Sequence, residues 1–513
     1  MSLITIVQES ALQTTAQGGA FDPESTQQLF ANTFTGDAAR ALAPMVSLTV
    51  GILVLLVCEL FEGLKKIRPA VFLGAILASA WGCWGLWQHT PEIGAPVRVL
   101  GGTLLVSQQV GVWGMVFLAA TLVAWMQARK YYRQEAPFLG EHDVLMLTAP
   151  IGMMMMAGAQ DLITFFIGLE LLSIPLYCLA AFRRVRNDSV EAGLKYFVLG
   201  AFGVAMFLYG AGLLYTATGT MSLPELRQVG EALETPLART GIALMLGSLF
   251  FKASIFPFHL WVPDVYQGSP TPVTSLMATG TKAAAIAFLL EASFLVPVSA
   301  ATLIGILAVL TLAVGNFGAL MQKDLKRMLA WSGIAHAGTL LFTVAASAAT
   351  DGLLNAEATQ AAVLYMAAYV FTAGGAFALL SWLEADGEHH TTIDGLRGLG
   401  QRRPGMAAGM TLFLLSLGGI PATGGFIGKF FVFGAAVQAD MIALSIAGIL
   451  LSVVALGYYL RVVIAMWMQP AKDGQAPPMA ERPWAAACVG FCAAMVVAIG
   501  VLPGFLSGST LFP

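Results

Sequence analysis

Charged residues are scarce in this chain of 513 residues, in which Asp, Glu, Lys and Arg together account for 11%. A soluble domain carries about 25%. Apolar residues account for 58% and the mean hydropathy is +0.78, whereas a soluble core stops growing at roughly 250–300 residues. The composition therefore excludes a soluble enzyme, a nucleic-acid-binding protein and a disordered scaffold. The formal net charge of −3 likewise gives no reason to expect a nucleic-acid partner.

Cysteine is also rare, and motifs for cofactors are missing. The five cysteines are scattered through apolar runs, and only Cys488 and Cys492 lie one helical turn apart. Iron–sulfur and zinc sites usually need four clustered ligands, so we expect no metal and no disulfide in this chain. The sequence has no phosphate-binding loop of the G-x-x-x-x-G-K-[ST] type. Any energy for its work must then come from elsewhere.

The N-terminus lacks a basic stretch followed by an apolar region and a cleavage site. We therefore expect no cleaved signal peptide. Residues 1–42 are predicted to be a polar N-terminal tail, to which we assign no role.

Long apolar runs are abundant, and a membrane-spanning helix needs about 20 such residues. The sequence predicts an all-α, polytopic membrane protein with about fourteen spans: 43–63, 69–88, 105–128, 142–159, 161–182, 192–217, 240–260, 271–296, 299–321, 327–348, 358–384, 404–436, 440–467 and 484–505. The seventh runs into Pro257 and Pro263, and the twelfth contains a Gly- and Pro-rich stretch at 417–425. Such broken helices mark cavities and ion paths.

The basic residues orient these spans. The N-terminal tail and the loops after even-numbered spans hold only Arg40, Arg98, Arg227 and Arg239. The loops after odd-numbered spans hold seventeen: Lys65, Lys66, Arg68, Arg129, Lys130, Arg133, Arg183, Arg184, Arg186, Lys323, Lys326, Arg327, Arg397, Arg402, Arg403, Lys472 and Arg482. The positive-inside rule then predicts cytoplasmic odd loops and both termini outside.

Five basic residues remain, all within spans. Arg461 lies near a cytoplasmic helix end, where it can reach the interface. The other four are Lys195, Lys252, Lys282 and Lys429. Four unpaired lysines at helix centres would cost roughly 10–14 kcal/mol on the insertion scale, so each is a candidate functional residue. Lys195 lies near a helix start and could equally reach the interface.

Two further titratable groups lie deep in apolar spans. Glu170 is flanked by aliphatic residues near the middle of the fifth span, and it is the natural partner of one of the lysines. The spacing leaves open which lysine it meets. His336 could be a core histidine or a relay group. Buried lysines, a glutamate and a histidine suit proton transfer, because each can exist in two protonation states.

Five segments carry a resemblance to the antiporter-like membrane subunits of respiratory complex I. The family also has relatives in cation/proton antiporters and membrane-bound hydrogenases. The segments are GLELLSIPLY at 168–177, FFK at 250–252, PFHLWVPDVYQGSPTPV at 257–273, QKDLKRMLAWSGIAH at 322–336 and GGIPATGGFIGKF at 418–430. Of the three types of such subunit, the L type has a long extra C-terminal helix along the membrane, whereas this sequence ends soon after its fourteenth predicted span. The M type has a glutamate where this chain has Lys429, and the chain looks most like the third type.

The resemblance implies two inverted five-helix repeats, each with one broken helix. The expected organisation is a tail at 1–42, three N-terminal spans at 43–139, repeats at 140–296 and 297–468, and a loop with a C-terminal span at 469–513. It also implies a multi-pass protein of the bacterial inner membrane, with both termini on the periplasmic side.

The resemblance further implies a mechanism of proton translocation. Glu170 would pair with Lys252, and a change arriving from a neighbouring subunit would alter that pairing. The proton would pass through Lys282 and His336 to Lys429, with Lys195 modulating Glu170 or proton entry. NADH, FMN, iron–sulfur clusters and quinone would belong to other subunits. The expected partners are other complex I membrane subunits, namely the M type and small membrane subunits, and the lipid bilayer.

Three rival readings remain open at this stage. A self-sufficient cation/proton antiporter would use the same broken helices and lysines. A subunit of a membrane-bound hydrogenase or ferredoxin-linked complex would differ only in an electron donor bound elsewhere. A purely structural membrane spacer accounts for the spans but not for three deep lysines.

Overall fold

The computed structural model describes residues 36–87, 97–129, 131–132, 139–352, 355–384, 392–470 and 482–502. These residues are almost entirely helical, with one antiparallel pair of short strands, β1 (Val97–Val99) and β2 (Leu104–Val106). The longer helices are α3 (Gly36–Leu60), α4 (Arg68–Trp87), α5 (Gln108–Ala128), α6 (Leu139–Gly158), α7 (Leu162–Ala180), α8 (Asn187–Thr218), α10 (Pro236–Ala253), α12 (Thr271–Glu291), α13 (Val298–Leu320), α14 (Leu325–Ala349), α15 (Asn355–Leu383), α17 (Pro404–Gly418), α18 (Gly424–Gln438), α19 (Ile442–Met468) and α20 (Pro483–Val501). Shorter α-helices are α9 (Leu223–Leu226), α11 (Trp261–Gly268) and α16 (Leu399–Arg402), and 3-10 turns cover Glu62–Ile67, Leu100–Gly102, Gly230–Glu234, Ser293–Leu295 and Ile393–Leu396.

The prediction of an all-α polytopic membrane protein is confirmed. In the described part of the chain, 11 helices are long and apolar enough to cross a membrane, and α17 and α18 are shorter apolar helices. Each of the fourteen predicted ranges contains a helix, although the number fourteen itself stays a prediction. The first helix of the described residues, α3, begins at Gly36, so the end of the predicted tail is helical; residues 1–35 lie outside the described residues.

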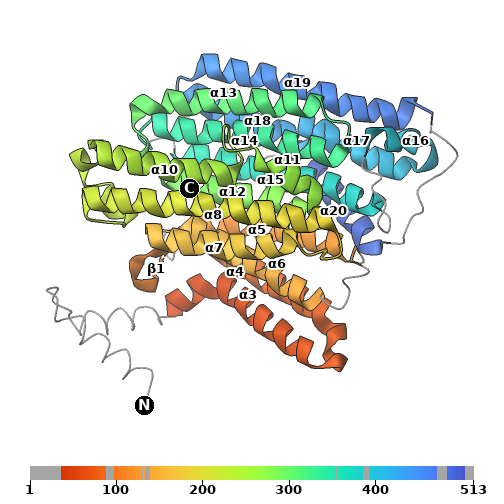
Figure 1. Ribbon diagram of the computed structural model, residues 1–513, viewed down its shortest axis with the longest axis horizontal. Coiled ribbons are helices and arrows are strands. Elements are labelled where there is room, and N and C mark those ends of the chain that lie inside the picture. Colours follow the sequence, from red (N-terminus) through yellow and green to blue (C-terminus); the bar gives the residue numbers. More distant parts are fainter. Residues whose placement is uncertain are drawn as a thin grey trace.

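Most of the long helices lie side by side with roughly parallel axes (Figure 1), with α13 and α19 at one edge, whereas α3 and α4 run obliquely at the other. Helices α12, α14 and α15 occupy the interior. Every residue of α12 from Thr271 to Leu290 is buried, whereas α8 exposes apolar side chains such as Phe197 and Phe202 along one face. A helix without lipid contact can carry a lysine at its centre, because its neighbours rather than lipid surround the charge.

Both predicted breaks are present. Helix α10 ends at Ala253, Ser254 has a positive φ of 68°, and the helical path resumes with α11 at Trp261. Pro263, expected to help break the span, instead lies in the first turn of α11, where a proline is tolerated.

The second break separates α17 from α18. Gly419, at a φ of 87°, ends α17, and the helix restarts at Gly424. A left-handed residue after the last helical turn is the usual helix terminator, and glycine adopts it without a steric cost. The predicted span 404–436 is thus two helices rather than one.

Candidate functional site

Lys252 lies in the last turn of α10, immediately before the first break. Its Nζ donates to Ser173 Oγ at 2.7 Å and to Tyr196 OH at 3.3 Å. The rings of Tyr177 and Tyr196 lie 5.7 and 5.3 Å from this nitrogen. A cation is favoured at this position by the carbonyl dipoles of the helix C-terminus and by the two aromatic faces.

Glu170 lies on α7, three residues before Ser173. Its buried Oε1 has no hydrogen-bond partner among the described residues. No ion pair shorter than 4 Å joins Glu170 and Lys252 in that part of the chain, so the direct pairing implied by the resemblance is not formed. Ser173, one turn along the same helix, takes the hydrogen bond from Lys252 instead.

Lys282 lies in the middle of α12 and is fully buried. Its Nζ is 5.6 Å from the centre of the Tyr266 ring and has no hydrogen-bond partner within the described ranges. A Cβ added to Gly333 of α14 would come within 2.8 Å of this nitrogen and 3.3 Å of Tyr369 OH. The missing side chain of Gly333 therefore makes room for the lysine head between α11, α14 and α15.

His336 is held on α14 by tyrosines from two other helices. Its Nδ1 is 2.5 Å from Tyr365 OH, and its Nε2 is 3.3 Å from Tyr459 OH. The Tyr369 ring lies 4.8 Å from the imidazole. Both ring nitrogens thus have a hydroxyl that can donate or accept, so the site accommodates either tautomer or the protonated ring.

Lys429 lies on α18 but reaches back across the second break. Its Nζ donates to the carbonyl oxygens of Leu417 and Gly418, at 3.0 and 3.1 Å. These carbonyls end α17 and carry the negative end of its dipole. Lys252 and Lys429 therefore both lie at the C-terminus of the first half of a broken helix.

A small cavity connects His336 with the second break. Its lining is rich in hydroxyl groups and comprises His336, Tyr365, Tyr369, Thr372, Ser416, Leu417 and Gly425. Leu417 supplies one of the two carbonyls bound by Lys429. A polar-lined space of this kind suits ordered water, which could extend hydrogen bonding from His336 to Lys429.

The family described as the transmembrane subunits of NADH:quinone oxidoreductase and Mrp antiporters matches residues 159–455, which include Glu170, Lys252, Lys282, His336 and Lys429. The chain belongs to this family. NADH-quinone oxidoreductase subunit N of Myxococcus xanthus is 39% identical over 500 residues, covering 91% of this chain and 95% of that protein. Subunit N of Trichlorobacter lovleyi is 44% identical over 367 residues, covering 70% of this chain and 74% of that protein.

Solved structures agree with this membership. A chain of respiratory complex I from Thermus thermophilus superposes with a TM-score of 0.75 at 34% identity, covering 90% of this chain and 98% of that one. A chain of the archaeal membrane-bound sulfane sulfur reductase superposes with a TM-score of 0.78 at 23% identity, covering 92% and 97%, which shows a shared fold. The described residues of this family member contain no group of three or more His, Cys, Asp or Glu side chains that could hold a metal ion.

Lys195, the sixth candidate, does not join the other five in this family member. Its side chain is 44% exposed, and its Nζ lies 2.6 Å from Glu191 and 3.7 Å from Asp264. Asp264 in turn accepts a hydrogen bond from Arg327 at 2.7 Å. Lys195 thus lies among exposed charges at the predicted cytoplasmic end, which fits the alternative that its side chain reaches the membrane interface.

Sequence reasoning missed the tyrosines that connect the site and misplaced two cations. Tyrosines within apolar spans could have indicated these residues, because a buried tyrosine hydroxyl usually finds a polar partner. The five tyrosines are Tyr196, Tyr266, Tyr365, Tyr369 and Tyr459. Lys326 and Arg482 were assigned to loops, but they are buried, with 4% and 3% exposure. Both contact Glu384, which follows the last turn of α15.

Proposed function

We propose that this chain is subunit N of a proton-translocating NADH:quinone oxidoreductase, and that its buried lysines and histidine carry protons. The observation that carries the proposal is the series of Lys252, Lys282, His336 and Lys429 on α10, α12, α14 and α18. Lys252 and His336 bind tyrosine hydroxyls, Lys282 faces a tyrosine ring and Lys429 binds the carbonyls at the second break. Keeping such groups in a membrane is costly without a function. The close similarity to proteins named subunit N supports the choice of subunit type.

The first half of the proposed route begins at Glu170. A change of charge arriving from a neighbouring subunit acts on this carboxylate, whose Oε1 is buried without a partner in the described part of the chain. Ser173 lies one turn from Glu170 on α7 and accepts the hydrogen bond from Lys252, so the serine hydroxyl transmits the change to the lysine. The proton leaves Lys252 for Lys282 past the Tyr196 and Tyr266 hydroxyls, with internal water completing the path.

The second half runs from Lys282 to Lys429. Tyr369 lies beside both Gly333, which faces the Lys282 head, and the His336 ring. His336 accepts the proton on one nitrogen and releases one from the other, which its two hydroxyl partners allow. Water in the hydroxyl-lined cavity takes the proton to Lys429 and from there to the outside.

The proposed mechanism uses two inverted repeats, at 140–296 and 297–468. Supporting this, α6 packs on α7 as α13 packs on α14. Asp161 caps α7 and bridges to Ser222 after α8, and Asp324 caps α14 and bridges to Thr392 after α15. These two backbone bridges, Asp161–Ser222 and Asp324–Thr392, occupy equivalent places in the two repeats. By the predicted orientation, they lie at opposite ends of the molecule.

The assembly follows from the same proposal. NADH, FMN, iron–sulfur clusters and quinone bind to other subunits, and an M-type subunit and small membrane subunits are the neighbours of this chain. The complex lies in the bacterial inner membrane with both termini of this chain outside. Lys195 modulates proton entry through its exposed charge network rather than by contact with Glu170.

Proton pumping by the assembled complex tests this function. Sealed inside-out vesicles that contain Lys252→Ala or Glu170→Ala should oxidise NADH with a strongly reduced proton gradient, while the complex still assembles. Lys65→Ala, which removes an exposed lysine paired with Glu62, is the matched control and should pump normally. Normal pumping in both site variants would refute the assignment of this pair.

A cation/proton antiporter that works alone is the alternative, because the family includes Mrp antiporter subunits. Purification separates the two. Subunit N should co-purify with redox subunits, whereas an antiporter should exchange ions after reconstitution by itself.

A further inference from the structure

Six helix ends meet around the carboxylate of Glu384. Its Oε2 accepts a hydrogen bond from Tyr131 OH at 2.5 Å, and its Oε1 accepts one from Thr271 Oγ1 at 2.7 Å. Lys326 Nζ is 3.8 Å from Oε1 and donates to the carbonyl of Ser269 at 2.6 Å. Glu384 follows α15 and Tyr131 follows α5, while Thr271 and Lys326 begin α12 and α14.

Two arginines complete this group, which we call the Glu384 cluster: Tyr131, Arg183, Thr271, Lys326, Glu384 and Arg482. Arg482, at the start of α20, donates to the carbonyls of Ser381 and Glu384. The guanidinium groups of Arg183 and Arg482 lie 5.6 and 5.5 Å from the Tyr131 ring centre. By the predicted orientation, odd-numbered spans end at the cytoplasmic side and even-numbered spans begin there. Each of the six residues lies at such a helix end, so the whole Glu384 cluster is predicted to lie on the cytoplasmic side.

The cluster touches water on one side and the interior on the other. The Glu384 side chain keeps 10% exposure, whereas that of Lys326 keeps 5%. Thr271, which binds the carboxylate, is the first residue of α12, the helix that carries Lys282. The carboxylate therefore lies between the solvent at this end and the helix at the centre of the proposed route.

A polar stripe runs along α12 from the cluster to Lys282. Thr271, Ser275, Thr279 and Lys282 follow one another at intervals of four, four and three residues, which places them on one helix face. The stripe spans about 16 Å at 1.5 Å per residue. Ser275 Oγ accepts a hydrogen bond at 3.0 Å from Gln127 of α5, so a second helix extends the polar contacts halfway along.

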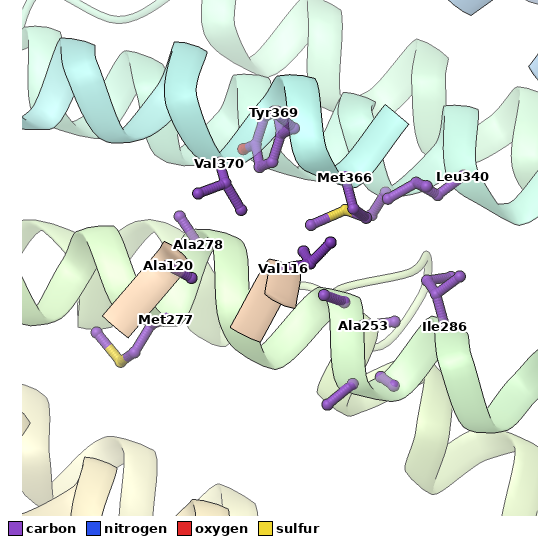
Figure 2. Packing of buried hydrophobic residues seen from close by; sticks show 14 of the residues in the cluster. Val116, Ala120, Ala253, Met277, Ala278, Ile286, Leu340, Met366, Tyr369 and Val370 are labelled. Atoms are coloured by element: carbon purple, nitrogen blue, oxygen red, sulfur yellow. The ribbon is translucent and has the colours of Figure 1, made fainter. Parts of the chain in front are cut away.

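The surroundings of the stripe are otherwise apolar. In Figure 2, Ala278 of α12 and Val370 of α15 face one another, with Ala120 of α5 close by. Each hydroxyl of the stripe has a hydrogen-bond partner, as a buried polar group needs: Thr271 donates to Glu384, Thr279 donates to the carbonyl of Ser275, and Ser275 accepts from Gln127. Thr274 and Thr281 of α12 lie outside the stripe and donate to backbone carbonyls, whereas the stripe places its hydroxyl groups on one face that leads to Lys282.

We propose that Glu384 is the proton-uptake group of this subunit. This inference rests on the proposed function and adds the entry point to it. A proton from cytoplasmic water binds the Glu384 carboxylate. Once Lys282 has passed the proton received from Lys252 on to His336 and is a neutral amine, the new proton moves along the α12 stripe and reloads it. Lys282 becomes the ammonium as Glu384 returns to the carboxylate. When Glu384 is deprotonated, Lys326 is the counter-ion of its carboxylate. Arg183 and Arg482 hold the Tyr131 ring, whose hydroxyl binds that carboxylate.

The test is Glu384→Gln in the assembled complex. Glutamine keeps the size of the side chain and one acceptor oxygen for Tyr131 or Thr271, but its NH2 group only donates and the amide does not carry the proton. We expect the rate of proton pumping per assembled complex to fall by at least about tenfold, as for loss of a positioned proton donor, and Glu384→Asp to restore part of it. Pumping by the glutamine variant should also slow more in D2O than pumping by the unaltered complex.

Glu291→Gln is the matched control. Glu291 lies at the other end of α12, where it binds Gln160 and Arg227, and its replacement should leave pumping unchanged. If the glutamine variant of Glu384 fails to assemble, Thr271→Val leaves the ion pair in place and removes the first hydroxyl of the stripe, with the same expected loss.

Two outcomes would overturn the inference, and they differ from failure of the proposed function. Normal pumping and a normal D2O effect in Glu384→Gln or, where that variant does not assemble, in Thr271→Val, would show that the cluster only holds helix ends together. Lys282→Ala should abolish pumping in either case. Normal pumping in Lys282→Ala would instead refute the proposed function itself.

Discussion

Replacing Lys282, which is buried, and Lys429, which is partly buried, by methionine should change local stability in opposite directions. Lys282 Nζ is buried with no hydrogen-bond partner among the described residues, whereas Lys429 Nζ binds two carbonyls. An unsatisfied buried polar group costs about 1–3 kcal/mol, and methionine fills a similar volume without one. Lys282→Met should therefore stabilise α12, while Lys429→Met should destabilise the end of α17 by a similar amount.

Amide hydrogen exchange of the purified complex measures both effects locally. A change of about 1–3 kcal/mol corresponds to roughly 5–150-fold in the exchange rate. Exchange in α12 should slow in Lys282→Met, and exchange in α17 should accelerate in Lys429→Met. Proton pumping should be lost in both variants, so stability and activity separate. Faster exchange of α12 in Lys282→Met would contradict the reasoning, because it would mean that the ammonium has a stabilising partner.

Three further outcomes are expected. Gly333→Ala places a Cβ 2.8 Å from Lys282 Nζ, so pumping should fall several-fold with normal assembly, and pumping assays in sealed vesicles check this. Tyr365→Phe removes the 2.5 Å partner of His336 and should reduce pumping more than Tyr459→Phe, which removes the 3.3 Å partner; equal effects would argue against ordered transfer through Nδ1. Gly152→Ala places a Cβ 2.5 Å from a backbone nitrogen of α7, and forcing these helices apart should cost about 1–3 kcal/mol, seen as faster amide exchange in α6 and α7.

The sequence predicted the parts of the fold and site that depend on local composition. Apolar runs located the helices, and Ser254 and Gly419 end helices where the sequence predicted breaks. Lys252, Lys282 and Lys429 were identified because a charge is costly in lipid wherever its neighbours lie. Each of these inferences needs only a short window of residues.

Contacts between distant segments could not be predicted in the same way. Lys326 counts as a loop residue in any positive-inside tally, yet it is buried against Glu384 because α14 and α15 bring them together. Tyr131 and Glu384 are 253 residues apart in sequence. The hydrogen bond from Lys252 to Ser173, one turn from Glu170 on α7, likewise joins segments that the spacing along the chain does not bring together.

The complete enclosure of α12 has a consequence for how the protein is made. Its neighbours include α5 and α6, which are synthesised before it, and α14 and α15, which are synthesised after it. A nascent chain that has reached α12 but not α15 still has the side of α12 that faces α15 uncovered. Insertion of Lys282 at the centre of that helix costs about 2.5–3.5 kcal/mol, so this intermediate is the one most in need of a chaperone or an insertase. Chains truncated before Asn355 should then be removed by membrane proteases, whereas chains truncated within the last helix should persist longer.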